Sequence, residues 1–205
     1  MSKKEPGSGA KPRPDLHPEF VALGFLAEGP AHGYELYRRF TASLGSLWHI
    51  SESQFYATLK RSEAHGFIVA STLEKGEGGA KRLLSLSPEG RRLLLVWINE
   101  PTRGSARLVH MEFLARLFLA RIIAPLKLRS IIIKQTAALD KEIRRLRLVS
   151  EGSHAGGTID GLSADFRESQ LRAAVAWIES KIIPTVESGQ WPGPYDKSKT
   201  ARRHT

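Results

Sequence analysis

Apolar positions in the first third of the chain predict three short helices. The segment "HPEFVALGFLAEGP" has a helix start near Pro18 and a Gly-Pro stop, and "HGYELYRRFTASLG" has apolar residues at four-residue spacing up to Gly45. The third segment, "ISESQFYATLKRSEAHG", opens on Ser51 or Ser53 as the N-cap and closes on Gly66.

A β-hairpin and a further helix are predicted next. In "FIVASTLEKGEGGAKRLLSLS", two runs rich in Ile, Val, Leu and Thr flank a glycine-rich connection. Ser87 then reads as an N-cap with Pro88 at the first helical position, and this helix stops before Pro101. Three helices, a hairpin and another helix form the order that is typical of a winged helix-turn-helix.

The second half is predicted to be helical, with helices over 106–123, 125–149 and about 162–187. The last helix has two apolar faces. Leu162, Phe166, Ala173 and Trp177 form one, and Leu171, Val175, Ile178 and Ile182 form the other. A helix that is apolar on two sides must be covered on two sides, and a second copy of the chain is the expected cover for one. The candidate dimerisation residues are Phe166, Leu171, Val175, Trp177, Ile178 and Ile182.

These patterns predict a mainly α protein with a small β-hairpin, in two folded parts. We expect an N-terminal winged helix-turn-helix domain over 18–100 and a C-terminal helical dimerisation domain over 101–189. The flanking segments 1–17 and 190–205 are basic and rich in polar residues and are expected to be disordered.

The third helix has a narrow apolar edge and a varied polar face. Phe55, Leu59 and Ser62 fall together when placed at about 100° per residue, and we expect this edge to pack inward. The opposite half carries Ser53, Gln54, Ala57, Lys60 and Arg61. Such a mixture of donors, acceptors and positive charge suits a helix in the major groove of DNA, although an ordinary solvated helix explains the face equally well.

Charge alone does not identify the partner of this face. The 205-residue chain has a formal net charge of +10, but 18–100 carries nine basic and nine acidic residues. Cations at the predicted hairpin tip, Lys75, Lys81 and Arg82, follow the third helix in sequence. A cationic wing beside a recognition helix can contact an adjacent groove or the phosphate backbone.

Other classes of protein find little support in the sequence. The absence of cysteine excludes a disulfide framework and thiolate chemistry. The first residues lack the apolar core of a signal peptide, and arginines interrupt the most apolar run, over 113–126, so we expect a cytoplasmic protein without a membrane span. There is no phosphate-binding glycine loop, nucleophile elbow or convincing carboxylate pair. We therefore expect no enzyme activity and no cofactor. The histidines lack metal-ligand spacing, so we expect no metal site either.

Several of these segments together resemble the PadR family of transcriptional regulators. The resemblance is carried by "HGYEL", by "QFYATLKR" with the following "GFI", and by "SPEGRRLLLVW" after the hairpin. It covers Pro18 to Glu100 in detail and extends loosely to Glu187, where "AWIE" matches the branch with a helical dimerisation domain. Ser62, Leu84 and Ser87 depart from the residues that are usual in the family. The resemblance implies a dimeric winged helix-turn-helix protein that binds double-stranded DNA and usually represses transcription.

The resemblance also transfers functional residues. It implies DNA contacts from the second helix, the third helix and the wing. These candidates are Tyr34, Ser51, Ser53, Gln54, Tyr56, Thr58, Lys60, Arg61, Lys81 and Arg82.

The family further implies a small aromatic effector, and Trp97 is the candidate contact because it lies near the junction of the two halves. A helix tryptophan among apolar neighbours is more often a packing residue, so core packing is the favoured interpretation of Trp97. A protein-interaction adaptor that uses the winged fold without reading DNA is the alternative function, and the neutral charge over 18–100 is its best support.

Overall fold

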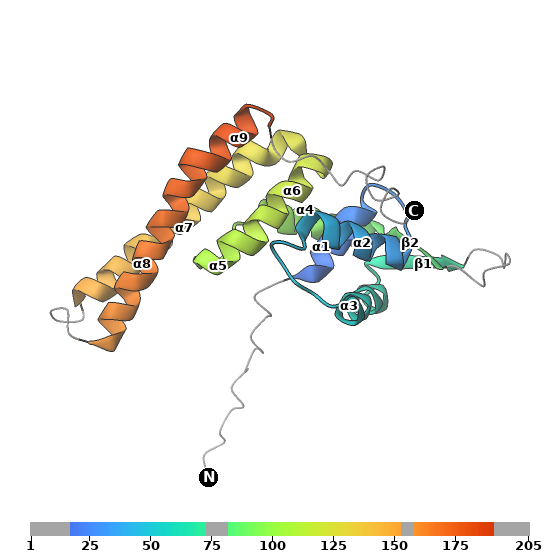
Figure 1. The fold of residues 1–205 in the computed structure, drawn as a ribbon, viewed down its shortest axis with the longest axis horizontal. Coiled ribbons are helices and arrows are strands. Elements are labelled where there is room, and N and C mark those ends of the chain that lie inside the picture. The colour runs from blue at the N-terminus through green and yellow to red at the C-terminus, as the bar shows by residue number, and fades with distance from the viewer. Residues whose placement is uncertain (1–16, 73–81, 153–157, 191–205) are drawn as a thin grey trace, which may run out of the picture.

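The computed structural model describes residues 17–72, 82–152 and 158–190 (Figure 1). The first half contains α1 (Pro18–Leu26), α2 (Gly33–Leu44), α3 (Glu52–Ala64), β1 (Ile68–Thr72), β2 (Arg82–Leu86) and α4 (Pro88–Asn99). This confirms the predicted order of three helices, a hairpin and a further helix. Lys75 and Lys81, and nearly all of the predicted tails, lie outside the described residues.

Side-chain capping fixes the starts of α3 and α4. Ser51 caps α3, and Ser87 caps α4 with Pro88 in its first turn. The Ser87 hydroxyl accepts a hydrogen bond from the Gly90 N–H (2.9 Å) and donates one to the carbonyl of Gly66 (2.7 Å). A Cβ on Gly90 would lie 2.2 Å from the Phe67 carbonyl oxygen, so only glycine allows α4 to begin this close to β1.

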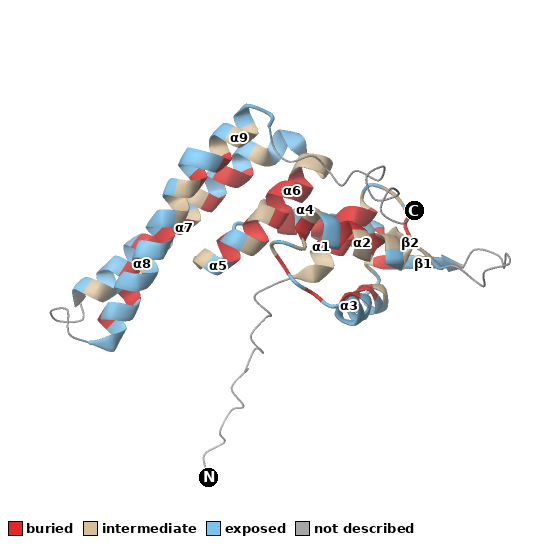
Figure 2. Ribbon diagram, viewed as in Figure 1, coloured by how far each residue is buried: buried red, intermediate tan, exposed pale blue. Residues whose placement is uncertain are grey.

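Helix α1 lies at the centre of the winged part. Every residue from Val21 to Leu26 is buried, and α1 contacts α2, α3, α4, α6 and β2. A helix that is apolar on all sides is stable only when neighbours surround it, and Figure 2 shows α1 within the buried centre of this part. The antiparallel hairpin β1–β2 packs at its edge, and Ala31 forms a bridge with Leu84 along the other side of β2.

The second half is helical, as predicted. It consists of α5 (Ala106–Leu108), the π-helical turn η1 (Val109–Phe113), α6 (Leu114–Ile123), the 3-10 turn η2 (Pro125–Lys127), α7 (Leu128–Gly152), α8 (Ile159–Trp177), the π-helical turn η3 (Ile178–Ile182) and α9 (Ile183–Glu187). Helices α7 and α8 pack side by side and extend away from the winged part (Figure 1). The predicted fold class, mainly α with a small hairpin and a helical second half, is confirmed.

Packing continues across residue 100, where the sequence suggested a domain boundary. Helix α6 packs on α1 and α4, and the ring centroids of Phe25 and Phe118 lie 6.3 Å apart. Gly24 lies so close to Leu119 that a Cβ on the glycine would come within 2.5 Å of that side chain. Part of the second half therefore completes the core of the first.

Candidate nucleic-acid interface

A reciprocal capping box fixes the start of α3. The Gln54 N–H donates to Ser51 Oγ (3.3 Å), and the Ser51 N–H donates to Gln54 Oε1 (3.1 Å). Two of the N–H groups that a helix start leaves unpaired are thereby satisfied. The cap uses the carbonyl oxygen of the Gln54 side chain and leaves its NH₂ group, which carries two donors, outside the cap.

The two faces of α3 lie as the sequence predicted. Phe55, Leu59 and Ser62 are buried, which confirms the inward edge. On the other face, the side chains of Ser53, Gln54, Ala57, Lys60 and Arg61 are exposed. Within the described residues, neither Lys60 nor Arg61 forms an ion pair with a carboxylate. Lys60 and Arg61 are thus outside the ion pairs of this region, although the Arg61 guanidinium donates a hydrogen bond to the Thr58 hydroxyl.

The structure conflicts with the prediction that Thr58 contacts DNA. Its side chain is buried, and its hydroxyl donates to the carbonyl of Gln54 (3.0 Å) and accepts from Nη2 of Arg61 (3.1 Å). Because α3 packs against α1, α2 and β1, its buried stripe is wider than one edge and includes residue 58. Thr58 holds the Arg61 guanidinium and does not face solvent.

Two tyrosines extend the exposed face toward α2. Tyr34 is 59% exposed, and the Arg38 guanidinium lies 5.7 Å from the centroid of its ring. A Cβ on Gly33 would lie 2.8 Å from the ring of Tyr56, so this glycine lets the phenol lie against the start of α2. Burial, with the nearby Glu52 and Tyr34, raises the pKa of Tyr56 above its ordinary value. Sequence reasoning missed Arg38, although its i+4 spacing from Tyr34 was a usable signal.

The first residue of strand β2 contacts α3 and the N-cap residue of α2. Nη2 of Arg82 lies 2.5 Å from Oε1 of Glu63 on α3, and Nδ1 of His32 lies 2.8 Å from the Arg82 carbonyl oxygen. Between α3 and β2 is a cavity of about 570 Å³ lined by Tyr56, Lys60, Arg82 and others. Of the predicted wing contacts, Arg82 is thus engaged within the chain, and Lys81 lies outside the described residues.

Trp97 is part of a buried polar network where the two halves meet. Its indole N–H donates to Oε1 of Glu112 (3.0 Å), and Glu112 also forms a buried ion pair with Arg116. The guanidinium carbon of Arg116 lies 4.6 Å from the centroid of the indole ring, and Phe20 stacks on the ring at 4.8 Å. Burial lowers the pKa of Arg116, and the charge of Glu112 opposes that shift.

The same tryptophan lines a cavity of about 550 Å³ between α1, α4 and the η1–α6 segment. Phe20, Trp97 and Arg116 form part of its wall. The Nε of Arg116 is buried and has no hydrogen-bond partner within the described residues. Trp97 is therefore a packing residue, as favoured from the sequence, and it also lines a cavity.

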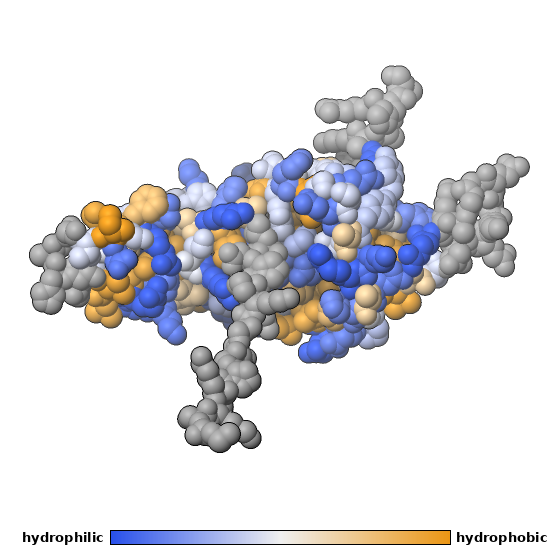
Figure 3. All heavy atoms as spheres, turned by 90° about the horizontal axis from the view of Figure 1, so that it is seen from below, coloured by the Kyte–Doolittle hydropathy of each residue, from blue (hydrophilic) through white to orange (hydrophobic). Residues whose placement is uncertain are grey.

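The two apolar faces of the last helix have different surroundings. Leu171, Ile178 and Ile182 are buried within the single chain and Val175 is half-buried, so this face supplies packing inside the chain. Phe166 is 64% exposed, Leu162 is also exposed, and Trp177 is half-buried. Of the predicted dimerisation residues, Phe166 and Trp177 thus belong to the less covered face. Apolar surface also gathers where α7 and α8 approach their connecting loop (Figure 3).

Two further findings concern the described residues as a whole. Over 17–72, 82–152 and 158–190, no helix combines the length and the apolar character needed to cross a membrane. In the same ranges, no three His, Cys, Asp or Glu side chains gather in a way that could hold a metal ion.

Comparison with known proteins gives a match over the winged part. Residues 22–95 match the transcriptional regulator PadR-like family. A "probable transcriptional regulator" of Mycobacterium tuberculosis is 37% identical over 87 residues, which are 40% of this chain and 46% of that protein. The "negative transcriptional regulator PadR" of Bacillus subtilis is 31% identical over 80 residues, which are 39% of this chain and 44% of that protein. The matched region thus spans less than half the length of each relative.

Solved structures of low sequence identity are also similar. B. subtilis PadR in complex with operator DNA has a TM-score of 0.39 at 22% identity, covering 82% of this chain and 98% of that one. A PadR-like transcriptional regulator from Bacillus cereus has a TM-score of 0.38 at 21% identity, covering 84% and 99%. Both scores are low, so the comparison rests on the sequence matches. The family match begins within α1, includes α3 and the hairpin, and ends within α4. By these matches, residues 22–95 are similar to the PadR-like family of transcriptional regulators.

Proposed function

We propose that the protein is a cytoplasmic, sequence-specific DNA-binding repressor that acts as a homodimer on an inverted-repeat operator. The observation that carries the proposal is the capped, exposed polar face of α3 beside a hairpin, with Lys60 and Arg61 outside the ion pairs of this region. The "negative transcriptional regulator" of B. subtilis, which has been solved with operator DNA, supports it through 31% identity over 80 residues. In this proposal 18–100 binds DNA and 101–189 mediates dimerisation.

In this proposal, different residues on the exposed face of α3 contact base edges and phosphates. The NH₂ group of Gln54 and the hydroxyl of Ser53 lie in the first turn, where a recognition helix meets base edges in the major groove. Lys60 and Arg61 lie further along the helix, where cations meet the phosphate backbone. In a two-fold dimer the two α3 helices read half-sites about one helical turn, or a multiple of it, apart.

Gln54→Glu is the sharpest test of base reading. Glutamate at this position keeps the oxygen that accepts from the Ser51 N–H, so the capping box survives. The change removes the NH₂ donors, and we expect operator affinity to fall by about 1–3 kcal/mol while binding to scrambled DNA changes much less. Fluorescence anisotropy with both DNAs at physiological salt measures the difference.

Two controls separate the possible outcomes of that experiment. Lys60→Gln should weaken binding to operator and scrambled DNA alike and reduce the salt slope by about one. A Glu also adds negative charge near DNA, so an equal loss on both DNAs in the Gln54 variant would show repulsion and contradict base reading. If the unmodified protein binds neither DNA at low salt, the adaptor hypothesis, which the neutral charge over 18–100 favours, replaces the repressor.

An effector site in the cavity beside Trp97 completes the proposal. The stacked rings of Phe20 and Trp97 offer an aromatic wall to such a ligand. A structure of B. subtilis PadR holds p-coumaric acid, an aromatic acid, which supports an aromatic ligand here. Since the cavity lies between the winged part and the helices that follow it, a ligand that favours one arrangement of the two shifts DNA binding.

Filling the cavity tests this site without breaking its polar network. Val96 is 43% exposed and lines the cavity, so Val96→Phe should occupy the space and weaken an aromatic ligand by about tenfold or more, about 1.4 kcal/mol. Quenching of tryptophan fluorescence by phenolic acids and planar cations, followed by operator release, is the measurement. Ile133→Phe, on the exposed side of α7, is the matched control. Unaltered quenching in the Val96 variant would place the ligand elsewhere.

A further inference from the structure

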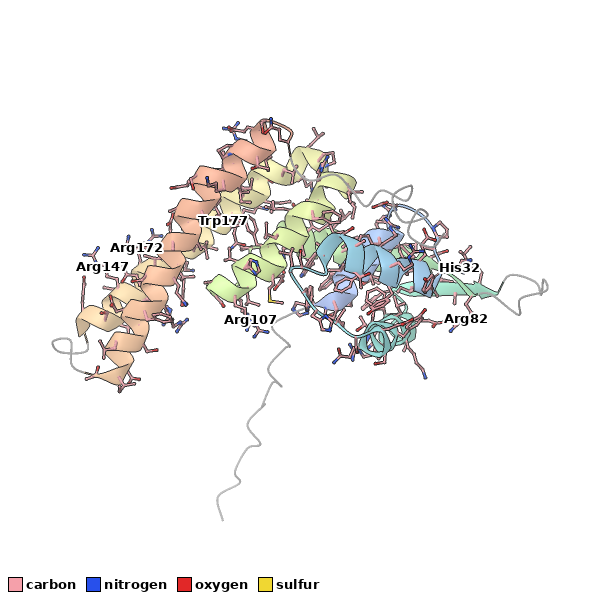
Figure 4. All side chains as sticks on the ribbon, in the orientation of Figure 1. His32, Arg82, Arg107, Arg147, Arg172 and Trp177 are labelled. Carbon is pink, nitrogen blue, oxygen red and sulfur yellow. The ribbon has the colours of Figure 1, made fainter. Side chains whose placement is uncertain are left out.

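At the base of the wing, Arg82 of β2 contacts both the start of α2 and helix α3. Arg82 is the first residue of β2, and its register partner, Thr72, is the last residue of β1. Its carbonyl accepts a hydrogen bond from the His32 ring at the N-cap of α2, and its guanidinium pairs with Glu63 on α3. Figure 4 labels Arg82 and His32. In the His32 contact the ring N–H is the donor, since a carbonyl can only accept.

The strand is also held further along. The N–H and carbonyl of Leu84 exchange hydrogen bonds with those of Ala31, both at 3.0 Å. This backbone bridge fixes the middle of β2 to the loop before α2. The direction in which the hairpin extends from the winged part is then set by the contacts of Arg82, at the start of β2.

The ion pair at this base determines what Arg82 has left to offer DNA. The Arg82 side chain is 60% exposed and that of Glu63 is 31% exposed, so a phosphate could approach the guanidinium. However, the paired carboxylate cancels its charge locally, whereas Lys60 and Arg61 carry no such partner within the described residues. To bind a phosphate, Arg82 would have to release or share the Glu63 carboxylate. Arg82 would therefore add little to phosphate binding.

We propose that Arg82 is a positioning residue that sets the angle between the wing and the recognition helix, and that it is not a phosphate contact. The proposal rests on the proposed DNA-binding function for its consequence, but the anchoring itself is a property of the free protein. Glu63 and His32 act with Arg82 as its two anchors, so all three affect DNA through the placement of the hairpin.

The test compares Arg82→Gln, Glu63→Gln and the double variant in the full chain. Positioning predicts that each single change weakens operator binding by about two- to fivefold, the range expected of an exposed ion pair. It predicts that the double variant is no weaker than either single variant, because one interaction is lost in all three. It also predicts an unaltered salt slope, because the number of neutralised phosphates does not change.

A direct phosphate contact predicts the opposite pattern. Arg82→Gln would then lower the salt slope by about one, and Glu63→Gln would leave binding unaltered or tighten it by removing a negative charge. Either result overturns the proposal. Arg92→Gln is the matched control, because Arg92 forms an exposed pair with Glu89 inside α4 that joins no second element. It should leave affinity and slope unaltered.

A second measurement does not need DNA. Amide hydrogen exchange of the free protein should show faster exchange at Leu83, at the Arg82 end of β2, in the Arg82 and Glu63 variants, and no change in the Arg92 control. Unaltered exchange in both variants overturns the anchoring. If the unmodified protein binds no DNA while the exchange effect is present, the repressor proposal fails and the positioning of the wing stands.

Discussion

Arg116→Met should lower the free energy of unfolding by about 3–5 kcal/mol. The substitution leaves the Glu112 carboxylate buried without its cation, and it removes the donor to the Glu100 carbonyl and the cation above the Trp97 ring. A buried charge that loses its partner has neither water nor a counter-charge to stabilise it. Chemical denaturation followed by far-ultraviolet circular dichroism measures the loss, and the melting temperature should fall by about 6–20 °C for a chain of this size.

The double variant Glu112→Gln/Arg116→Met is the matched control. It removes both charges and keeps an oxygen at residue 112 that accepts the indole N–H of Trp97. Replacing a whole buried pair is often close to neutral, so the double variant should be clearly more stable than Arg116→Met alone. Equal instability of the two would show that the lost packing of Arg116, and not the unpaired carboxylate, dominates.

Phe166→Glu should convert the proposed dimer into a folded monomer. In the single chain this side chain is 64% exposed on α8, so a carboxylate is tolerated there, and the stability of the monomer should change by no more than about 0.5 kcal/mol. Against the same face of a second copy, the carboxylate would be desolvated without a partner. Sedimentation velocity should show a monomer, and operator affinity should fall by about a hundredfold because the two half-sites are no longer bound together.

Leu126→Glu is the control for that variant. Leu126 is 98% exposed in the turn η2, at the start of α7, so it tests whether any new surface carboxylate weakens the assembly. We expect it to remain dimeric and to bind operator normally. A Phe166 variant that stays as dimeric as the unmodified protein would rule out this face of α8 as the main contact.

Shortening the chain after Glu100 is a poor way to test dimerisation. Helix α6 lies beyond that point, yet it packs on α1 and α4 and brings Phe118 against Phe25. Without α6 the buried helix α1 would lose part of its cover and expose apolar surface. Full-length surface variants such as Phe166→Glu avoid this difficulty.

Local signals in the sequence were sufficient for much of the fold. Capping serines, Pro88 and the apolar spacing predicted α1 to α4 and the hairpin because caps and helix periodicity depend on residues within a few positions of each other. The same periodicity identified the inward edge of α3 and the two unlike faces of the last helix. The mixture of side chains on the outer face of α3 was likewise readable, since it requires only the 100° rotation between residues.

What the sequence could not determine depends on contacts between distant residues. Thr58 is buried because three elements converge on α3, and Arg82 is paired because the hairpin returns to Glu63, 19 residues earlier. Trp97 both packs in the core and lines a cavity because η1 brings Glu112 to its indole N–H. The core extends past residue 100 because α6 packs on α1. Helix periodicity reports which side of an element is apolar, whereas the neighbour that covers that side, and the partner of each charge, follow only from how the elements pack together.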